Sequence, residues 1–265
     1  MKEFHSRHER RAYFHGLQGE EKYAAFQEMI DESARIVFFG GAGVSTESGI
    51  PDFRSKDGLY NKPDIQFSDY APEYLLSSDC LFDEPKVFFE FYRQKLDVRG
   101  IEPNVAHYKL AEMEKAGKLS AVVTQNIDGL HEKAGSKTVY NIHGTTFRNY
   151  CTGHPHHELP SDFILDSKEA VPHCPICGRM VRPDVTLYGE ALPDDAVYGA
   201  VRAIEDADML IIAGTSLTVY PAASFVRYFQ GQNLVIINRD ATPMDSEADL
   251  VFHESIGKVL GMVKV

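Results

Sequence analysis

Five short apolar segments constrain the fold of this chain more than any other feature of its sequence. They are residues 34–39, 121–123, 138–142, 209–213 and 234–237. The first runs into a glycine turn, and each of the others is followed by polar residues. Apolar runs of strand length that alternate with helical segments are typical of parallel sheets with helical crossovers. We therefore expect an α/β fold with a Rossmann-like, doubly wound parallel sheet.

The polar residues that follow these segments predict where a ligand binds. In an open parallel sheet, ligands bind outside the carboxyl ends of the strands. We therefore expect one cleft that the glycine turn shares with Thr124–Asp128, His143–Gly144, Gly214–Ser216 and Asn238–Asp240.

The glycine turn after the first segment indicates a nucleotide site. Gly40, Gly41 and Gly43 fall where the strand ends, and glycine permits a positive φ and the close approach of a ligand. An ordinary strand-to-helix turn is the alternative. The dinucleotide fingerprint fits poorly, because Thr46 stands where it needs a third glycine and no acidic strand end follows about 20 residues later. Hydride transfer is therefore disfavoured.

The remaining segments are mostly helical. Residues 20–33 have the spacing of an amphipathic helix. Residues 64–98 have helical patterns, with Pro85 near a helix start. Asn104 can cap a helix that stops at Gly117, and Pro221 can open another. Residues 1–19 are an N-terminal extension without an assigned structure.

A segment rich in cysteine and histidine, residues 151–183, interrupts the alternation of strands and helices. We expect residues 20–52, 102–144 and 190–265 to form the sheet domain. A helical part, 53–101, and a zinc-ribbon part, 145–189, are expected to form a smaller inserted domain.

The cysteine spacing predicts a structural zinc site. Cys174 and Cys177 form a C-x-x-C knuckle, and Cys151 with His154 gives C-x-x-H. Structural zinc needs four ligands, so we expect Cys151, His154, Cys174 and Cys177 to bind it. A ribbon that folds without metal is the alternative. Three further histidines compete for the fourth position: His156, His157 and His173. Cys80 stands apart and is expected to be a small buried or surface residue.

Composition excludes several classes of partner. The formal net charge of −12 argues against nucleic acid or an anionic membrane as the main partner. No apolar run approaches the 18 or so residues that span a bilayer. Four cysteines, three of them near one predicted metal site, do not look like a disulfide framework. We expect a cytoplasmic protein.

Several ordered motifs together resemble the sirtuins, the NAD-dependent protein lysine deacylases. The resemblance covers nearly everything from residue 20 onward. Its motifs are GAGVSTESGIPDFR at 41–54, TQNIDGLHEKAG at 124–135, HG at 143–144, the cysteine module, VRPDVTLYGEALP at 181–193, GTSLTVYP at 214–221 and Asn238.

The resemblance implies that NAD is a consumed co-substrate and that NAD and an acylated lysine meet between a Rossmann-like domain and a small zinc domain. His143 would be the general base, since the pKa of histidine lies near neutrality. Asn126 and Asp128 would line the nicotinamide and ribose pocket, with Gln125 on the ribose hydroxyls. Taken singly, His143 could be a core or surface histidine, and the other three could cap a helix or close a turn.

The resemblance also implies further contacts. Segment 185–189 would pair with the backbone of a substrate peptide. The remaining NAD-binding residues would be Gly41, Ala42, Gly43, Phe53, Arg54, Ile127, Gly214, Thr215, Ser216, Asn238 and Ile256.

Some residues depart from the family pattern. His154 replaces a cysteine, Tyr188 a phenylalanine and Gly40 a threonine. Members that remove long acidic acyl groups carry Tyr-x-x-Arg where this chain has Phe89-Glu90-Phe91-Tyr92, so acetyl or other uncharged groups are expected. Two other functions stay open: a mono-ADP-ribosyltransferase, and a catalytically silent module that binds NAD or zinc.

Overall fold

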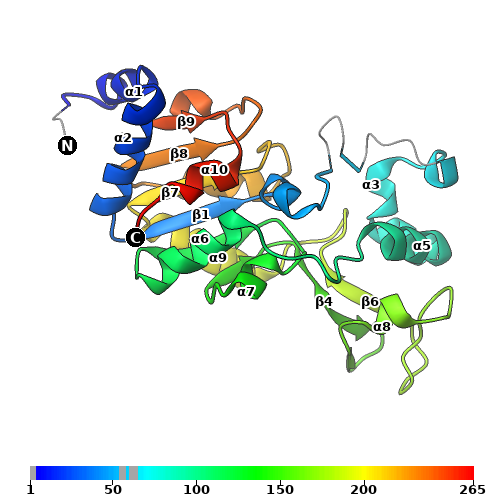
Figure 1. Ribbon diagram of the computed structural model, residues 1–265. Helices are drawn as coiled ribbons and strands as arrows, with labels where there is room; N and C mark the ends of the chain where they lie inside the picture. The colour runs from blue at the N-terminus through cyan, green and yellow to red at the C-terminus, as the bar shows by residue number, and fades with distance from the viewer. Residues whose placement is uncertain (1–3, 54–57, 60–64) are drawn as a thin grey trace.

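The larger part of the molecule is a six-stranded parallel sheet with helices on both faces (Figure 1). The computed structural model describes residues 4–53, 58–59 and 65–265. The strand order is β3-β2-β1-β7-β8-β9. The bounds are β1 Ile36–Gly40, β2 Leu119–Thr124, β3 Val139–Asn141, β7 Met209–Ala213, β8 Asn233–Ile237 and β9 Leu250–Phe252. All five predicted strands are confirmed, and β9 is an additional one.

Alternating side chains of each strand enter two separate cores. In β1, Ile36 and Phe38 face one core, whereas Val37 and Phe39 face the other. The first core is covered by α2 (Gly19–Glu32), α6 (Val105–Lys115) and α10 (Ile256–Gly261). The second is covered by α9 (Asp194–Asp206) and the 3-10 helix η4 (Ala222–Tyr228). The predicted doubly wound fold is therefore confirmed.

The ends of several helices follow from local sequence. Asn104 caps α6 as predicted, because its side-chain Oδ1 accepts the amide of Ala106 at 2.9 Å. Gly117, just beyond the helix, has a φ of +76°, which glycine adopts readily. In the N-terminal extension, Ser6 caps α1 (Arg7–His15), which packs Phe14 into the first core. The segment after Pro221 is the 3-10 helix η4 rather than an α-helix.

The smaller part of the molecule has a core of its own. Its antiparallel sheet has the order β5-β4-β6. Core residues from 67–96 and 151–187 pack together, so the helical and cysteine-rich segments share one apolar cluster. The exact domain boundaries stay a prediction. The elements are β4 Gly144–Cys151, β5 Glu158–Leu159, β6 Val181–Val185, η3 Ile65–Phe67, α3 Pro72–Leu75, α4 Ser78–Asp83, α5 Pro85–Lys95 and α8 Phe163–Asp166.

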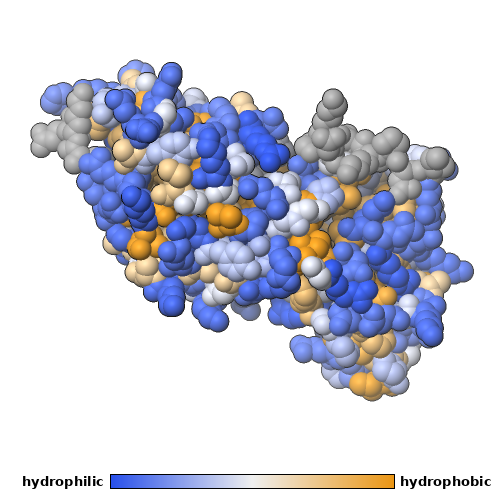
Figure 2. Space-filling model, viewed as in Figure 1, coloured by the Kyte–Doolittle hydropathy of each residue, from blue (hydrophilic) through white to orange (hydrophobic). Residues whose placement is uncertain are grey.

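The visible surface is mostly hydrophilic, with apolar residues gathered in smaller patches (Figure 2). Within the part of the chain that the structure describes, none of the helices combines the length and the apolar character that crossing a bilayer requires.

Candidate active site

The three central strands end side by side. Gly40 at the end of β1 pairs with Thr124 of β2 and with Ala213 of β7. The segments that follow these strands therefore start from the same edge of the sheet, as predicted. They contain η1 (Ala42–Val44) and η2 (Thr46–Ser48) after β1, and α7 (Leu130–Ala134) shortly after β2.

The glycines after β1 are required by close packing of two loops. The amide of Gly41 donates to Ala213 at 3.1 Å, and that of Gly43 donates to Gly214 at 2.9 Å. A Cβ atom on Gly43 would lie 2.7 Å from the Cα of Gly214, closer than real contacts allow. The prediction that this turn needs a positive φ is wrong, because Gly40, Gly41 and Gly43 all lack one. Gly214, on the facing loop, has a φ of +61°.

A buried hydrogen-bond network joins this turn to the segment after β2. The Ser45 hydroxyl donates to Asp128 Oδ2 at 2.6 Å and accepts from Asn126 Nδ2 at 3.0 Å. The other carboxylate oxygen of Asp128 accepts the Leu130 amide at 3.0 Å. Ser45, Asn126 and Asp128 are all at most 8% exposed. Sequence reasoning missed Ser45 as a site residue, although it lies in a conspicuous row of small hydroxyl residues.

The network influences the ionisation of Asp128. Burial raises the pKa of its carboxyl group, while the hydrogen bonds from Ser45 and Leu130 offset part of that rise. The net direction is upward. This carboxylate is therefore held in place by donors in an environment that disfavours its charge.

His143 lies between β3 and β4 with a defined tautomer. Its Nδ1 is 3.0 Å from the carbonyl oxygen of Gln125. Since a carbonyl only accepts, Nδ1 carries the proton and Nε2 keeps a free lone pair. Burial lowers the pKa of His143, and the hydrogen bond to Gln125 acts in the opposite direction. At neutral pH the imidazole is thus uncharged and basic at Nε2.

Other predicted NAD contacts surround the same edge. Gln125 Nε2 donates to Thr215 Oγ1 at 3.2 Å, which joins the segments after β2 and β7. The Ser216 hydroxyl is 2.7 Å from that of Thr218. Five of the predicted contact residues keep partial exposure there and so remain accessible: Ala42, Gly43, Gln125, Ile127 and Gly214.

The more distant candidates differ in their surroundings. Asn238 follows β8, and its side-chain amide donates to the backbone carbonyl of Asp240 at 2.8 Å. Ile256 begins α10 and is only 5% exposed, so most of its side chain serves the first core. Phe53 packs against the core of the smaller part. Arg54 lies outside the described residues.

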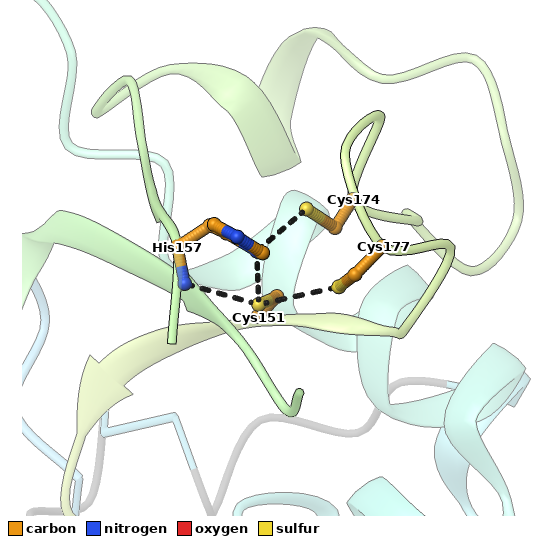
Figure 3. A group of neighbouring side chains, drawn as sticks. All are labelled: Cys151, His157, Cys174 and Cys177. Atoms are coloured by element: carbon orange, nitrogen blue, oxygen red, sulfur yellow. Dashed lines mark hydrogen bonds between the residues drawn. The ribbon is translucent and has the colours of Figure 1, made fainter. Parts of the chain in front are cut away.

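Four side chains in the smaller part converge on one point (Figure 3). They are Cys151, His157, Cys174 and Cys177, and their ligand atoms all lie within 4.8 Å of one another. Cys151 Sγ is 3.6 Å from Cys177 Sγ and 3.4 Å from His157 Nδ1, and Cys174 Sγ is 3.7 Å from the same nitrogen. Tetrahedral zinc would require about 3.8 Å between sulfurs and about 3.5 Å between sulfur and nitrogen. The group therefore fits zinc.

The structure corrects the fourth member of the predicted metal set. His157, not His154, lies against the cysteines, and His154 is exposed. The cause is the hairpin between β4 and β5. Tyr150 pairs with Glu158, so the chain returns with His157 opposite Cys151, whose amide donates to the His157 carbonyl at 3.0 Å.

The other histidine candidates have different partners. His156 Nδ1 lies 2.9 Å from the Cys151 carbonyl, and His173 pairs with Glu169. Although burial acts to raise it, backbone hydrogen bonds from His157 and Gly153 lower the pKa of Cys151 to about 6, which favours a thiolate ligand.

Cys80 lies apart from this metal group and is fully buried. Burial raises the pKa of its thiol to about 11, so it is a poor nucleophile.

Comparison with known proteins identifies the family. The profile of the Sir2 family matches residues 41–221. The chain belongs to the Sir2 family. Its relatives include proteins named NAD-dependent protein deacetylase from Clostridium perfringens and Clostridium acetobutylicum. The first is 54% identical over 246 residues, covering 92% of this chain and 99% of the relative. The second is 51% identical over 243 residues, covering 92% and 98%.

Solved structures of Sir2 proteins share the fold. One, described as showing the mechanism and regulation of Sir2 enzymes, is 36% identical, with a TM-score of 0.82 and coverage of 92% of this chain and 97% of the other. A Sir2 protein solved with a p53 peptide and NAD+ is 34% identical, with a TM-score of 0.79 and coverage of 92% and 96%.

Proposed function

We propose that this Sir2 family protein is an NAD-dependent protein lysine deacetylase. It would cleave NAD to nicotinamide, transfer the acyl group to ADP-ribose and release the free lysine. The observation that carries the proposal is the uncharged His143, with Nε2 free, at the same sheet edge as the buried network of Asn126, Ser45 and Asp128. The names of the clostridial relatives support the same activity.

The buried network would serve the first chemical step. As nicotinamide leaves, positive charge develops on the ribose, and the weakly nucleophilic acyl oxygen reacts only when it is held in line. Asn126 and Asp128 are suited to positioning because Ser45 holds the side chains of both. We assign these two residues to the nicotinamide and ribose pocket.

His143 would serve the second step. Its Nε2 would accept a proton from a ribose hydroxyl, which then attacks the alkylamidate intermediate and releases lysine. This role needs an uncharged imidazole, and burial provides it by lowering the pKa of His143.

The substrate would be an acylated lysine in a protein or peptide. Related Sir2 structures contain acetylated and propionylated peptides. In segment 185–189, the Tyr188 amide already donates to Leu76 and its carbonyl accepts from Ser78, so a peptide would use the remaining backbone groups. Phe89 and Tyr92 stand at the positions of the tyrosine and the arginine of the Tyr-x-x-Arg motif, and both are buried aromatic residues. Without that arginine, acetyl or another uncharged acyl group is favoured.

Cys151, His157, Cys174 and Cys177 would hold a structural zinc ion. Four protein ligands complete a tetrahedron and leave no open position for catalysis. None of the four cysteines of the chain forms a disulfide, which suits a reducing compartment, and we propose that the protein is cytoplasmic.

Product analysis with NAD labelled in its adenosine part tests this function. With an acetylated peptide, we expect nicotinamide, deacetylated peptide and soluble labelled acetyl-ADP-ribose. Label that stays on protein after washing would instead indicate a mono-ADP-ribosyltransferase. NAD binding by calorimetry without nicotinamide release, with any acyl peptide, would indicate a catalytically silent module.

A further inference from the structure

Asn104 makes more contacts than a helix cap needs. Its side-chain Oδ1 caps α6 by accepting the amide of Ala106. Its Nδ2 donates two further hydrogen bonds, to the Val44 carbonyl at 2.8 Å and to the Ser48 hydroxyl at 3.0 Å. Capping requires only an acceptor, which serine or aspartate supplies equally well. The two bonds from the side-chain amide nitrogen are therefore not needed for capping and act on the turn at 44–48 instead.

Those two bonds hold the turn that carries Ser45. Val44 precedes Ser45 directly, and Ser48 follows it three residues later, so Asn104 is hydrogen-bonded to the turn on both sides of Ser45. Ser45 is 1% exposed, and its hydroxyl contacts both Asn126 and Asp128. The position of the Ser45 hydroxyl is set by the backbone of the turn that carries it. Movement of the turn would therefore disturb both of these side chains.

The same helix also braces the other half of the network. The backbone amide of Asn104 donates to His107 Nδ1 at 3.2 Å, which completes a capping box. The His107 ring packs edge-on against His131 of α7, with centroids 4.7 Å apart, and both rings are buried. Helix α7 begins at Leu130, whose amide binds Asp128. The start of α6 thus contacts the turn at 44–48 directly and the segment at 126–130 through α7.

We propose that Asn104 is a positioning residue for the NAD site: its side-chain amide nitrogen fixes the turn at 44–48, so that the Ser45 hydroxyl holds Asn126 and Asp128 in the geometry that binds NAD for cleavage. This inference rests on the proposed function.

Two substitutions separate this role from helix capping. Asn104→Ser and Asn104→Asp both keep an oxygen that can cap α6, and both lose the side-chain NH2 group that donates to Val44 and Ser48. Asn104→Ser also controls for the charge that aspartate adds. We expect both to melt within a few degrees of the wild type, to raise the KM for NAD about tenfold or more, and to leave the KM for acetylated peptide within about twofold.

Ser6→Ala is the matched control, because it removes the N-cap of α1, which lies far from the turn in the sequence and outside the proposed site. It should lower the melting temperature slightly and leave the KM for NAD unchanged. Wild-type KM values in both Asn104 variants would overturn the positioning role, and so would equal losses for NAD and peptide.

The dissociation constant for NAD, measured by calorimetry on the same variants, keeps this inference separate from the proposed function. If the wild type binds NAD but turns over no acyl peptide, the proposed function fails. The Asn104 variants must still bind NAD about tenfold more weakly, and unchanged affinity would refute the positioning role.

Discussion

His143 can act as a base because one ring nitrogen is hydrogen-bonded and the other keeps its lone pair. Nδ1 donates to the Gln125 carbonyl, which fixes the ring and its tautomer and leaves Nε2 as the basic nitrogen. The ring is only partly exposed, and burial keeps its pKa below the ordinary value. Its own carbonyl accepts the Thr186 amide at 2.9 Å, a bond that a side-chain substitution leaves in place.

Substitution of His143 by alanine should therefore remove activity without unfolding the protein. We expect deacetylation to fall by about 100-fold or more, the usual contribution of a general base. Exchange of labelled nicotinamide into NAD should persist, since the base acts after nicotinamide leaves. Both are measured on purified protein, with His8→Ala, an exposed histidine of α1, as the control. An alanine variant with full deacetylase activity would exclude His143 as the base.

The pH profile of activity should show the same ionisation. As the pH rises through the folded-state pKa of His143, the ring loses its proton and becomes a base, so kcat rises and then levels off. Because burial lowers that pKa, the midpoint should lie below about 6.5. Stability shifts in the same sense, since the unfolded chain takes up this proton more readily and unfolding becomes easier as the pH falls. A midpoint above 6.5 in kcat measurements would contradict this assignment.

At the scale of elements, an ion pair between Arg182 and Glu190 helps to hold the link between β6 and α9. The Arg182 guanidinium, in a side chain 8% exposed, binds both oxygens of Glu190. Arg182 also donates to the Val185 carbonyl at 2.9 Å, and Glu190 accepts the Leu187 amide at 2.9 Å. The pair thereby shapes the segment whose Thr186 amide binds the carbonyl of His143.

Breaking this pair from one side should destabilise the protein more than removing both partners. Glu190→Leu leaves the buried guanidinium unpaired, and we expect a loss of about 2–3 kcal/mol, less than for a fully buried pair because the Glu190 side chain is 24% exposed. The double variant Arg182→Met with Glu190→Leu should lose less stability than Glu190→Leu alone, and therefore less than the sum of the single variants. Denaturant unfolding of the four proteins measures the coupling, and additive losses would show that the pair is not coupled.

The central strands could be predicted because each is buried on both faces and reads as a continuous apolar run. Strand β9 was missed although it is no shorter than β3, which was predicted. The helical stretch at 64–98 divides into separate helices, since Pro72 and Pro85 each begin a new one.

Part of the candidate site could likewise be predicted from the sequence, and part could not. The segments that hold Gln125, Asn126, Asp128 and His143 could be located because strand ends of a parallel sheet converge, and the resemblance to the sirtuins singled out these four residues. The contacts of Ser45 and the choice of His157 could not be predicted from spacing. They depend on how a turn meets a distant loop and on the register between β4 and β5.

At the scale of the whole molecule, one strand joins the proposed catalytic site to the metal group. Strand β4 begins directly after His143 and ends at Cys151. The larger part is stabilised by two apolar cores on the faces of its sheet, and the smaller part by a third core that includes Cys151 and Cys174. Figure 1 shows the two parts as separate lobes with β4 running from one into the other. Removal of the zinc ion that this group would hold should therefore lower both stability and activity.

Two histidine substitutions test the composition of the metal group. His157→Ala should lower zinc content well below one ion per chain and reduce the melting temperature, because three ligands bind zinc less tightly than four. His154→Ala should keep both near wild type, since His154 is exposed and lies outside the group. Elemental analysis and thermal melting give the two readouts. The reverse pattern would restore His154 as the ligand, and wild-type protein without zinc would refute a metal site.

The stoichiometry of the wild-type reaction tests the central claim most directly. Purified protein is incubated with NAD and an acetylated lysine peptide, and nicotinamide, deacetylated peptide and O-acetyl-ADP-ribose are quantified together. We predict that the three products form in equal amounts and that nicotinamide release requires the acetyl group. Nicotinamide release that is independent of the acetylated peptide, or an absence of turnover with every acyl peptide, would contradict the account.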